Sequence, residues 1–252
     1  MSDVSRRKLI TAAVASAGGV VGITLAGKVV RAKGLIPPDA GVLYGAGETL
    51  TYAAHRILTR NSMAREFSPD QVSKPPFANG VAPLGQAFER RKAAGFSDWR
   101  IDVDGMVAKP ASFALAELRN LPARSQITHL ACEEGWSYIA QWTGVPLAQV
   151  LALVGTPRQA RYVVYRSIEP DWWDSIDIEE ALHPQTLIAL GLNGGELPIA
   201  FGGPARMRVP RQLGYKSVKY LTRITVTDDL KRFGKGLGSS APEGGYAWYA
   251  GI

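Results

Sequence analysis

Apolar and polar positions become regular from Trp99 onward. Residues 100–104 alternate in character, which predicts a half-buried strand, and Gly105 then supplies a turn. The apolar run over 161–166 predicts a buried strand. Similar short runs predict further strands over 127–131, 207–209 and 221–226.

Helical spacing is found in three short segments. Residues 145–154 have a proline in the first turn, carry apolar residues on one helical face and end at Gly155. Residues 113–121 follow Ser112, and the pattern Ser-x-x-x-x-Glu suits a capped helix. Residues 178–182 predict a single helical turn.

A hairpin is predicted where Asn193-Gly194-Gly195 separates the runs 187–192 and 196–199. The Asn-Gly pair tolerates the positive φ angles of a type I′ turn. Strands and short helices alternate throughout this part of the chain without the length of βαβ units. The predicted fold class is therefore α+β, in the form of a β-rich domain.

Residues 34–95 show little sustained periodicity, and turn formers such as Pro37-Pro38, Pro75-Pro76 and Asn79-Gly80 are scattered through them. This pattern predicts a loop-rich segment that wraps around the domain. We therefore expect three regions, namely 1–33, the wrapping segment 34–95 and a single core over 96–252.

Residues 1–33 have the layout of an export signal. Ser5-Arg6-Arg7-Lys8 precedes the uncharged stretch 11–27, and Lys28 and Arg31 follow. Paired arginines before a modest apolar stretch resemble the twin-arginine signal, whose pathway carries folded proteins, often with a cofactor inserted. The alternative is an ordinary apolar helix with a chance arginine pair.

The export signal implies a periplasmic protein. No clear Ala-x-Ala cleavage site precedes Lys28. Residues 1–33 are therefore either a cleaved signal peptide or, if the segment 9–27 is not removed, a membrane tether.

The length of 252 residues and the 46% hydrophobic content allow a substantial core. The formal charge of +7 is concentrated at the front, because residues 1–33 hold six Lys or Arg and one Asp. The remainder carries 23 basic against 21 acidic residues. This near balance, without a basic stripe, argues against nucleic-acid binding.

Cys132 is the only cysteine, so no intramolecular disulfide can form. Free cysteines are commonly buried as small hydrophobes, which is the alternative reading of this residue. However, Cys132 lies where the predicted strand 127–131 gives way to the polar Glu133-Glu134-Gly135. A strand end exposes a side chain, as a ligand position requires.

The run Cys132-Glu-Glu-Gly-Trp-Ser137, followed by Trp142-Thr-Gly-Val-Pro-Leu147, resembles the molybdenum-ligand loop and following helix of the sulfite oxidase family. The resemblance covers roughly residues 60–250. It implies the sulfite oxidase fold, a single catalytic domain and a molybdenum-molybdopterin cofactor. Further segments follow the family in the same order, over 103–110, 115–122, 187–206, 209–210 and 214–219.

In this family resemblance, Cys132 is the metal ligand, since a thiolate is a soft donor that suits molybdenum. Positions that hold the pterin and its phosphate in family members correspond to the residues Asn61, Ser167, Arg206, Ser217 and Lys219. The alternative for each is a solvated surface residue. One departure is Phe201, which stands where the family usually places His or Asn.

Glu134 follows the expected ligand by two residues, so it is the candidate for proton transfer at the substrate. A surface carboxylate is the alternative. The cluster Asp171-Trp172-Trp173-Asp174 is expected to form part of the funnel to the metal, unless it packs against the wrapping segment.

Sulfite-oxidising relatives place basic residues soon after the ligand cysteine, whereas this chain has Glu133 and Glu134. Two carboxylates repel an anionic substrate. The pattern looks more like the bacterial periplasmic branch that includes reductases of protein methionine sulfoxide. We therefore expect reduction of S-oxides, with sulfite oxidase-type dehydrogenation as the alternative.

The chain has no Cys-x-x-Cys-His haem motif and no Rossmann glycine fingerprint. A separate electron carrier is therefore expected, either a membrane haem subunit or a soluble cytochrome. The sequence ends just after the expected core, which favours a monomer. Two rival functions are a thiol hydrolase that uses Cys132 and a non-catalytic exported binding protein.

Overall fold

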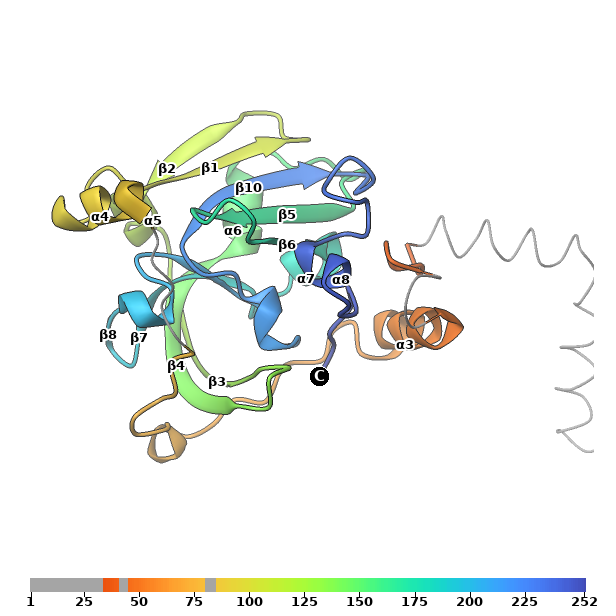
Figure 1. Cartoon of the computed structure of the whole chain (residues 1–252), viewed down its shortest axis with the longest axis horizontal. Coiled ribbons are helices and arrows are strands. Elements are labelled where there is room, and N and C mark those ends of the chain that lie inside the picture. Colours follow the sequence, from red (N-terminus) through yellow and green to blue (C-terminus); the bar gives the residue numbers. More distant parts are fainter. Residues whose placement is uncertain (1–33, 41–44, 80–84) are drawn as a thin grey trace, which may run out of the picture.

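A computed structural model describes residues 34–40, 45–79 and 85–252 of the chain. Within them, two β-sheets pack against each other and short helices lie around their edges (Figure 1). The predicted export signal over 1–33 lies outside the described residues. The α+β class predicted from the sequence is confirmed.

The first sheet has the strand order β2-β1-β10-β5-β6. Strands β1 and β10 are parallel, and the other neighbours are antiparallel. Its strands are β1 (Arg100–Gly105), β2 (Ala111–Ala114), β5 (Tyr162–Ser167), β6 (Trp173–Asp177) and β10 (Leu221–Thr227).

The second sheet has the order β3-β4-β7-β8, and β9 pairs with β7. A long hairpin joins β3 and β4, from Arg124 opposite Gly144 to Ala131 opposite Ser137. Its strands are β3 (Arg124–Ala131), β4 (Ser137–Pro146), β7 (Leu187–Leu192), β8 (Gly195–Glu196) and β9 (Arg206–Arg208).

The predicted turn between β7 and β8 is confirmed, although β8 is shorter than expected. Asn193 and Gly194 have φ angles of 49° and 83°, as a type I′ turn requires. The Asn193 side chain also accepts a hydrogen bond from the backbone N–H of Gln141 at 2.9 Å, which ties the turn to β4.

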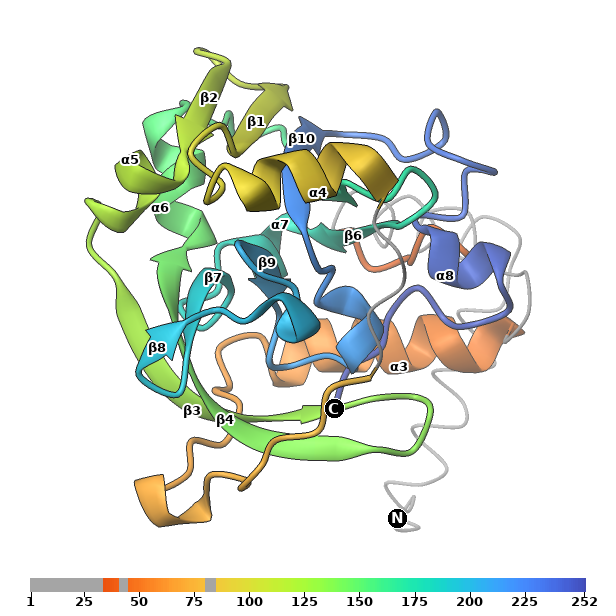
Figure 2. The same cartoon turned by 60° about the vertical axis from the view of Figure 1, so that its left-hand side comes forward.

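Helices α3 and α4 lie on opposite sides of the domain, at the right and left of Figure 1, and α4 lies above α3 in Figure 2. Helix α4 lies where β1 and β10 begin, and its Phe88 packs edge-on against Trp99 and Tyr220. The helices are α3 (Gly45–Leu58), α4 (Gly85–Ala93), α5 (Leu115–Arg119), α6 (Leu147–Leu153), α7 (Ile178–Ala181) and α8 (Ser240–Glu243), with 3-10 turns η1 (Pro69–Gln71), η2 (Ile199–Phe201) and η3 (Gly214–Lys216).

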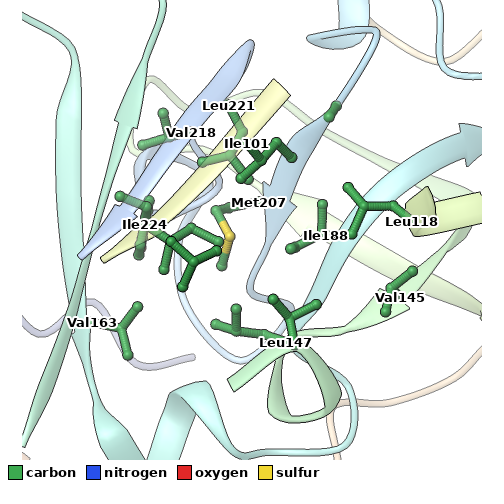
Figure 3. Close-up of a cluster of buried hydrophobic side chains, with 14 of the residues drawn as sticks. Ile101, Leu118, Val145, Leu147, Val163, Ile188, Met207, Val218, Leu221 and Ile224 are labelled. Carbon is green, nitrogen blue, oxygen red and sulfur yellow. The ribbon is translucent and has the colours of Figure 1, made fainter. Parts of the chain in front are cut away.

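The main hydrophobic core lies between the two sheets. Figure 3 shows Met207 of β9 among side chains from both of them, with Ile224 and Val163 from the first and Ile188 from the second. Leu147 of α6 closes this cluster and is fully buried. Because the core draws on both sheets, it fixes their relative position and hence the loops at their ends.

The C-terminal segment joins distant parts of the chain. The backbone N–H of Trp248 donates to the Asp39 carboxylate at 2.6 Å, across 209 positions of sequence. Its indole N–H donates to Ser175 Oγ at 2.8 Å. A bridge between Gln212 and Gly251 attaches the same segment to the turn before η3.

The expectation of a loop-rich segment over 34–95 was wrong for two stretches, which form α3 and α4. The aliphatic residues of α3 do not face the core, because its buried residues are Glu48, Arg56 and Tyr52, of which only the tyrosine packs in a hydrophobic cluster. An ordinary surface helix is recognised in a sequence by an apolar stripe that faces the core, and α3 does not have its aliphatic residues on that side.

Two predicted helices begin later than expected. Residues 111–114 form β2, so α5 starts only at Leu115, and the Glu117 carboxylate accepts from the Ala114 N–H at 2.6 Å. Strand β4, which the sequence did not reveal, runs to Pro146 and delays the start of α6. Strand β6 was missed as well.

Within the described residues, no helix is long and apolar enough to cross a bilayer.

We expect Leu147→Ala to lower the free energy of unfolding by about 2–5 kcal/mol, because it leaves a cavity between the sheets. Leu153, on the same helix but 52% exposed, is the matched control, and Leu153→Ala should cost less than about 0.5 kcal/mol. Urea unfolding measures both. Equal losses for the two variants would contradict the placement of the core.

Candidate active site

A cavity of about 380 Å³ opens beside the tip of the β3–β4 hairpin. Three parts of the chain form most of its wall, namely the hairpin loop 132–136, the segment around η2 and β9, and the segment 214–220. Five of the residues predicted for the site line it together: Cys132, Glu134, Arg206, Ser217 and Lys219.

Cys132 is held by a tight hairpin loop. Its N–H donates to the Trp136 carbonyl at 2.9 Å, and its carbonyl accepts from the Gly135 N–H at 3.1 Å. Gly135 has a φ of 91°, a conformation that favours glycine. The sequence therefore folds a short turn that fixes the half-buried thiol at the end of β3, as the sequence pattern suggested.

Two carboxylates surround the thiol. Cys132 Sγ lies 3.0 Å from Glu133 Oε2, to which it donates, and 3.9 Å from Glu134 Oε2. Burial raises the pKa of the Cys132 thiol to about 12, and the two neighbouring negative charges act in the same direction. Without a metal, the thiol is protonated at neutral pH and its partners are not histidines, so the arrangement disfavours a thiol hydrolase.

Glu134 is oriented by an aromatic neighbour. Its Oε2 accepts from the indole N–H of Trp136 at 2.5 Å. Trp136 stacks on Tyr138 and packs against Phe77, with ring centroids 6.1 and 5.0 Å apart. One side of the cavity is therefore aromatic and carries a carboxylate directed by a fixed donor.

A buried cation lies next to these aromatic residues, because Arg206 is hydrogen-bonded to Tyr138. Arg206 is 4% exposed, and its guanidinium donates to the carbonyls of Phe201 (2.7 Å), Met207 (3.3 Å) and Ser217. It lies 5.2 Å from the centroid of the Trp142 ring. Burial lowers the pKa of Arg206. Among the described residues, its charged partners do not include a carboxylate, and its side-chain hydrogen-bond partner is Tyr138.

Arg208 adds a second buried cation next to this wall. It is fully buried and lies 5.3 Å from the same Trp142 ring. Its Nη2 donates to Thr128 and His129, but its Nε and Nη1 have no hydrogen-bond partner among the described residues. The sequence offered no sign of this residue. Together the two arginines give the wall a positive potential that favours an anionic ligand.

Ser217 and Lys219 follow η3 and complete the positive side. Ser217 Oγ accepts from the Val209 N–H at 3.1 Å, and Lys219 Nζ donates to the Ala200 carbonyl at 2.9 Å. Burial and nearby Arg206 lower the pKa of Lys219 to about 8.

A buried ion pair that the sequence did not reveal supports this segment. Lys216 Nζ lies 2.6 Å from Asp174 Oδ1 and also donates to the Ser175 carbonyl at 3.0 Å. Both side chains are almost completely buried. The pair attaches η3 to β6, and so fixes the backbone that presents Ser217 and Lys219.

Two residues predicted to contact the cofactor lie outside the cavity wall. Ser167 is buried at the end of β5, where its hydroxyl accepts from the N–H of Glu169, which does line the cavity. Asn61 is exposed just after α3 and does not line it. Both assignments stay predictions.

The aromatic and acidic cluster 171–174 divides between two environments. Trp172 lines the cavity and is 46% exposed, as a funnel residue would be. Trp173 packs in a core cluster with Leu230 and Trp248, and Asp174 pairs with Lys216. Glu169 lines the cavity beside Trp172 and was not predicted from the sequence.

Phe201 stands where the sulfite oxidase family usually has His or Asn, and it contributes to the cavity through its ring and its backbone carbonyl. Its ring packs edge-on against Tyr138, with centroids 5.7 Å apart, and its carbonyl accepts from Arg206. The backbone of this position thus holds the buried cation, while the side chain adds to the aromatic wall.

Comparison with known proteins assigns the chain to a family. Residues 89–232 match the family described as "Oxidoreductase molybdopterin binding domain". This match covers more than half of the chain, and the chain therefore belongs to the molybdopterin-dependent oxidoreductases, whose cofactor is molybdenum-molybdopterin.

Two relatives illustrate the branch. A protein of Azospira oryzae, named as a candidate protein-methionine-sulfoxide reductase subunit YedZ1, is 38% identical over 192 residues, which is 76% of this chain and 69% of that protein. The catalytic subunit MsrP of protein-methionine-sulfoxide reductase from Xanthomonas campestris is 37% identical over 154 residues. That match covers 55% of this chain, which thus spans only 48% of MsrP.

The crystal structure of the sulfane dehydrogenase SoxCD from Paracoccus pantotrophus has the same fold. The TM-score is 0.52 at 19% identity, covering 68% of this chain and 46% of the other. Together with the family match, this similarity confirms the sulfite oxidase fold expected from the sequence.

The donor set of the cavity fits this cofactor. Among the described residues, no group of three or more His, Cys, Asp or Glu side chains could hold a metal ion. The soft thiolate of Cys132 suits a molybdenum that also carries the dithiolene sulfurs of molybdopterin. The buried Arg206, which has no carboxylate partner among the described residues, suits the anionic part of such a group.

Gly202 has no side chain, and this allows Lys219 to pack directly against its backbone. It has a φ of 97°, and a Cβ there would lie 2.7 Å from Lys219 Cγ. Gly194 has a similar φ of 83°, but no atom lies within 4 Å of its Cβ position. Both glycines therefore have a positive φ angle, but only Gly202 lies against another side chain.

We expect Gly194→Ala to cost about 1–2 kcal/mol through backbone strain alone. Gly202→Ala should cost about 1–3 kcal/mol more, because the added methyl group displaces Lys219. Thermal unfolding of the two variants provides the comparison. If they are equally stable, Gly202 does not constrain the lysine.

Proposed function

We propose that the protein is an exported molybdopterin oxidoreductase that reduces S-oxide substrates, such as methionine sulfoxide. The observation that carries this proposal is the pair of carboxylates, Glu133 and Glu134, within 4 Å of Cys132 Sγ. An anion such as sulfite is repelled at this position, whereas a neutral sulfoxide is not. The two relatives named for methionine sulfoxide reduction support the same direction.

In this proposal Cys132 is the molybdenum ligand, and Arg206, Ser217 and Lys219 hold the pterin and its phosphate. Asn61 and Ser167 remain further candidates for cofactor contacts. When bound, the cofactor supplies two-electron oxygen-atom transfer at sulfur. Proton donation and substrate binding are then the tasks of the protein side chains.

Glu134 is the candidate proton donor. Reduction of a sulfoxide consumes two electrons and two protons and yields a thioether and water, so the departing oxygen must be protonated. Glu134 faces the cavity, and the Trp136 indole N–H fixes one of its oxygens. A positioned carboxyl group of this kind meets the geometric requirement of a general acid.

The aromatic side chains at the cavity suit a methyl sulfoxide. Phe77, Trp136 and Trp172 line it, and Trp172 is about half exposed. Aromatic faces and edges attract polarisable sulfur groups without adding charge. The open position of Trp172 is also compatible with an oxidised methionine that is part of a protein.

The electrons are proposed to come from a separate carrier, either a membrane haem subunit or a soluble cytochrome. The names of the two relatives describe subunits, which supports a multi-component system. The arginine pair at positions 6 and 7, before an uncharged stretch, supports twin-arginine export to the periplasm. The catalytic chain itself is proposed to be a monomer.

Sulfite oxidation is the second candidate, because Arg206 and Lys219 line the same cavity and provide positive charge. In the proposal these cations serve the cofactor rather than the substrate. A non-catalytic binding protein is disfavoured by the family match.

We expect wild-type protein, made with its own export signal in a host that synthesises molybdopterin, to contain about one molybdenum per chain. Cys132→Ser should lose most of the metal, because a hydroxyl is a poor replacement for a soft thiolate ligand. Elemental analysis measures the metal, and circular dichroism checks the fold. Full metal content in the folded variant would refute the ligand assignment.

Glu134→Gln should lower kcat for methionine sulfoxide by about 10²-fold or more, because it removes the proton donor. Glu133→Gln is the matched control, since it removes an adjacent charge but leaves the Trp136 contact intact. Both variants should improve sulfite binding. Wild-type enzyme that turns over sulfite in preference to methionine sulfoxide would overturn the substrate assignment and leave the cofactor untouched.

A further inference from the structure

Helix α3 is attached to the domain by two charged residues and one tyrosine, whereas its large aliphatic residues face outward. Its buried residues are Glu48, Tyr52 and Arg56. Its large aliphatic residues Leu50 and Leu58 are instead 71% and 78% exposed. This is the reverse of an ordinary surface helix, which turns its apolar stripe to the core.

Buried ion pairs fix this orientation. Arg56 lies 2.6 Å from Asp177 and 3.3 Å from Glu180, and all three side chains are at most 7% exposed. The Tyr52 hydroxyl also donates to Asp177 at 2.9 Å. Rotating the helix to bury its leucines would remove Arg56 from both carboxylates and leave Glu180 only the longer contact with Arg211 at 3.9 Å, at a large cost in free energy.

The exposed residues form one continuous face. Leu50, Ala54, Ile57 and Leu58 follow the spacing i, i+4, i+7 and i+8, and all are exposed. Ile57 is 65% exposed. We call these four residues the α3 face. Single exposed aliphatic residues are common, but three large ones on one helical face mark an interaction surface.

Basic residues border the α3 face. Ile57 also lines a cavity of about 630 Å³, whose described lining includes four arginines against two carboxylates. Arg60 is 62% exposed and pairs loosely with Glu179 at 3.4 Å, and Arg158 is exposed. An apolar stripe beside exposed arginines matches the headgroup and acyl region of an anionic bilayer.

The position of α3 in the chain also favours a bilayer surface. The uncharged stretch 11–27, flanked by Arg7 and Lys28, precedes Gly45 by only 17 residues. Fully extended, 17 residues reach about 60 Å. While the stretch is attached and inserted in a bilayer, α3 therefore stays within that distance of the lipid surface.

We propose that the α3 face, with Arg60 and Arg158, docks the protein on an anionic lipid surface. A lipid surface fits better than a protein partner because the α3 face is too small for a stable protein interface. A helix of 14 residues is about 21 Å long and about 10 Å wide, which gives roughly 200 Å². A stable protein interface needs about 800 Å² on each side, whereas an interfacial helix binds lipid with a single face.

The test uses the full chain with its cofactor and phospholipid vesicles that contain a trace of phosphatidylcholine with a photoactivatable acyl chain. Because residues 11–27 can bind vesicles by themselves, crosslinks are mapped by mass spectrometry rather than counted in total. We expect crosslinks within residues 50–58. They should increase when phosphatidylglycerol replaces part of the phosphatidylcholine and decrease at high salt.

Replacing Leu50, Ile57 and Leu58 with Gln should reduce these crosslinks at least tenfold. The matched control is Leu153→Gln with Leu182→Gln, which changes two residues that are about half exposed outside α3. Arg60→Gln and Arg158→Gln should each weaken binding to anionic vesicles roughly fivefold. Thermal unfolding checks that each variant is folded, and Leu58→Gln alone serves if the triple variant is not.

Crosslinks confined to 11–27, or unchanged by substitutions on the α3 face, would overturn the proposal. A dimer in solution that the triple variant abolishes would show that a second copy covers the face. If the lipid crosslinks to α3 were absent and α3 were instead shielded from proteases in native membranes but not in vesicles of pure lipid, a membrane protein would be the partner. Either result would also refute docking on lipid.

Discussion

The site depends on a buried guanidinium group that has no carboxylate partner in the part of the chain that the structure describes. Arg206 donates to carbonyl oxygens of three different backbone segments, at Phe201, Met207 and Ser217. Burial of an unpaired charge is costly, and these carbonyl dipoles offset part of the cost. The remaining positive potential is available to an anionic ligand, so the same group that organises the wall also defines what the wall can bind.

The hairpin loop beside Cys132 carries the opposite charge and is supported differently. Glu133 and Glu134 lie on this five-residue loop, and they are positioned by the register of β3 and β4 rather than by ion pairs. Cys132 lies beside both carboxylates. The cavity thus combines positive groups suited to the cofactor with acidic and aromatic groups suited to a neutral substrate.

Sequence patterns revealed the elements whose apolar residues face the core, such as β1, β5 and the hairpin between β7 and β8. They failed for α3, whose buried residues are two charged side chains and a tyrosine, and for the start of α6, where β4 continues to Pro146. Cys132 and Glu134 were found because a distinctive run surrounds the cysteine. Arg208 and the Lys216–Asp174 pair were not, because charged residues leave no sign of burial in a single sequence.

The hydrogen bond between Trp248 and Asp39 joins residues 209 positions apart. During synthesis, this contact cannot form until the region around Trp248 has left the ribosome. The domain therefore cannot be completed before this segment is translated, and the pairings β1–β10, β5–β10 and β4–β7 also join strands that are distant in sequence. Tyr215, which lines the cavity, donates to the Ala247 carbonyl of the same segment at 2.6 Å, so this part of the cavity wall also receives its support late in synthesis.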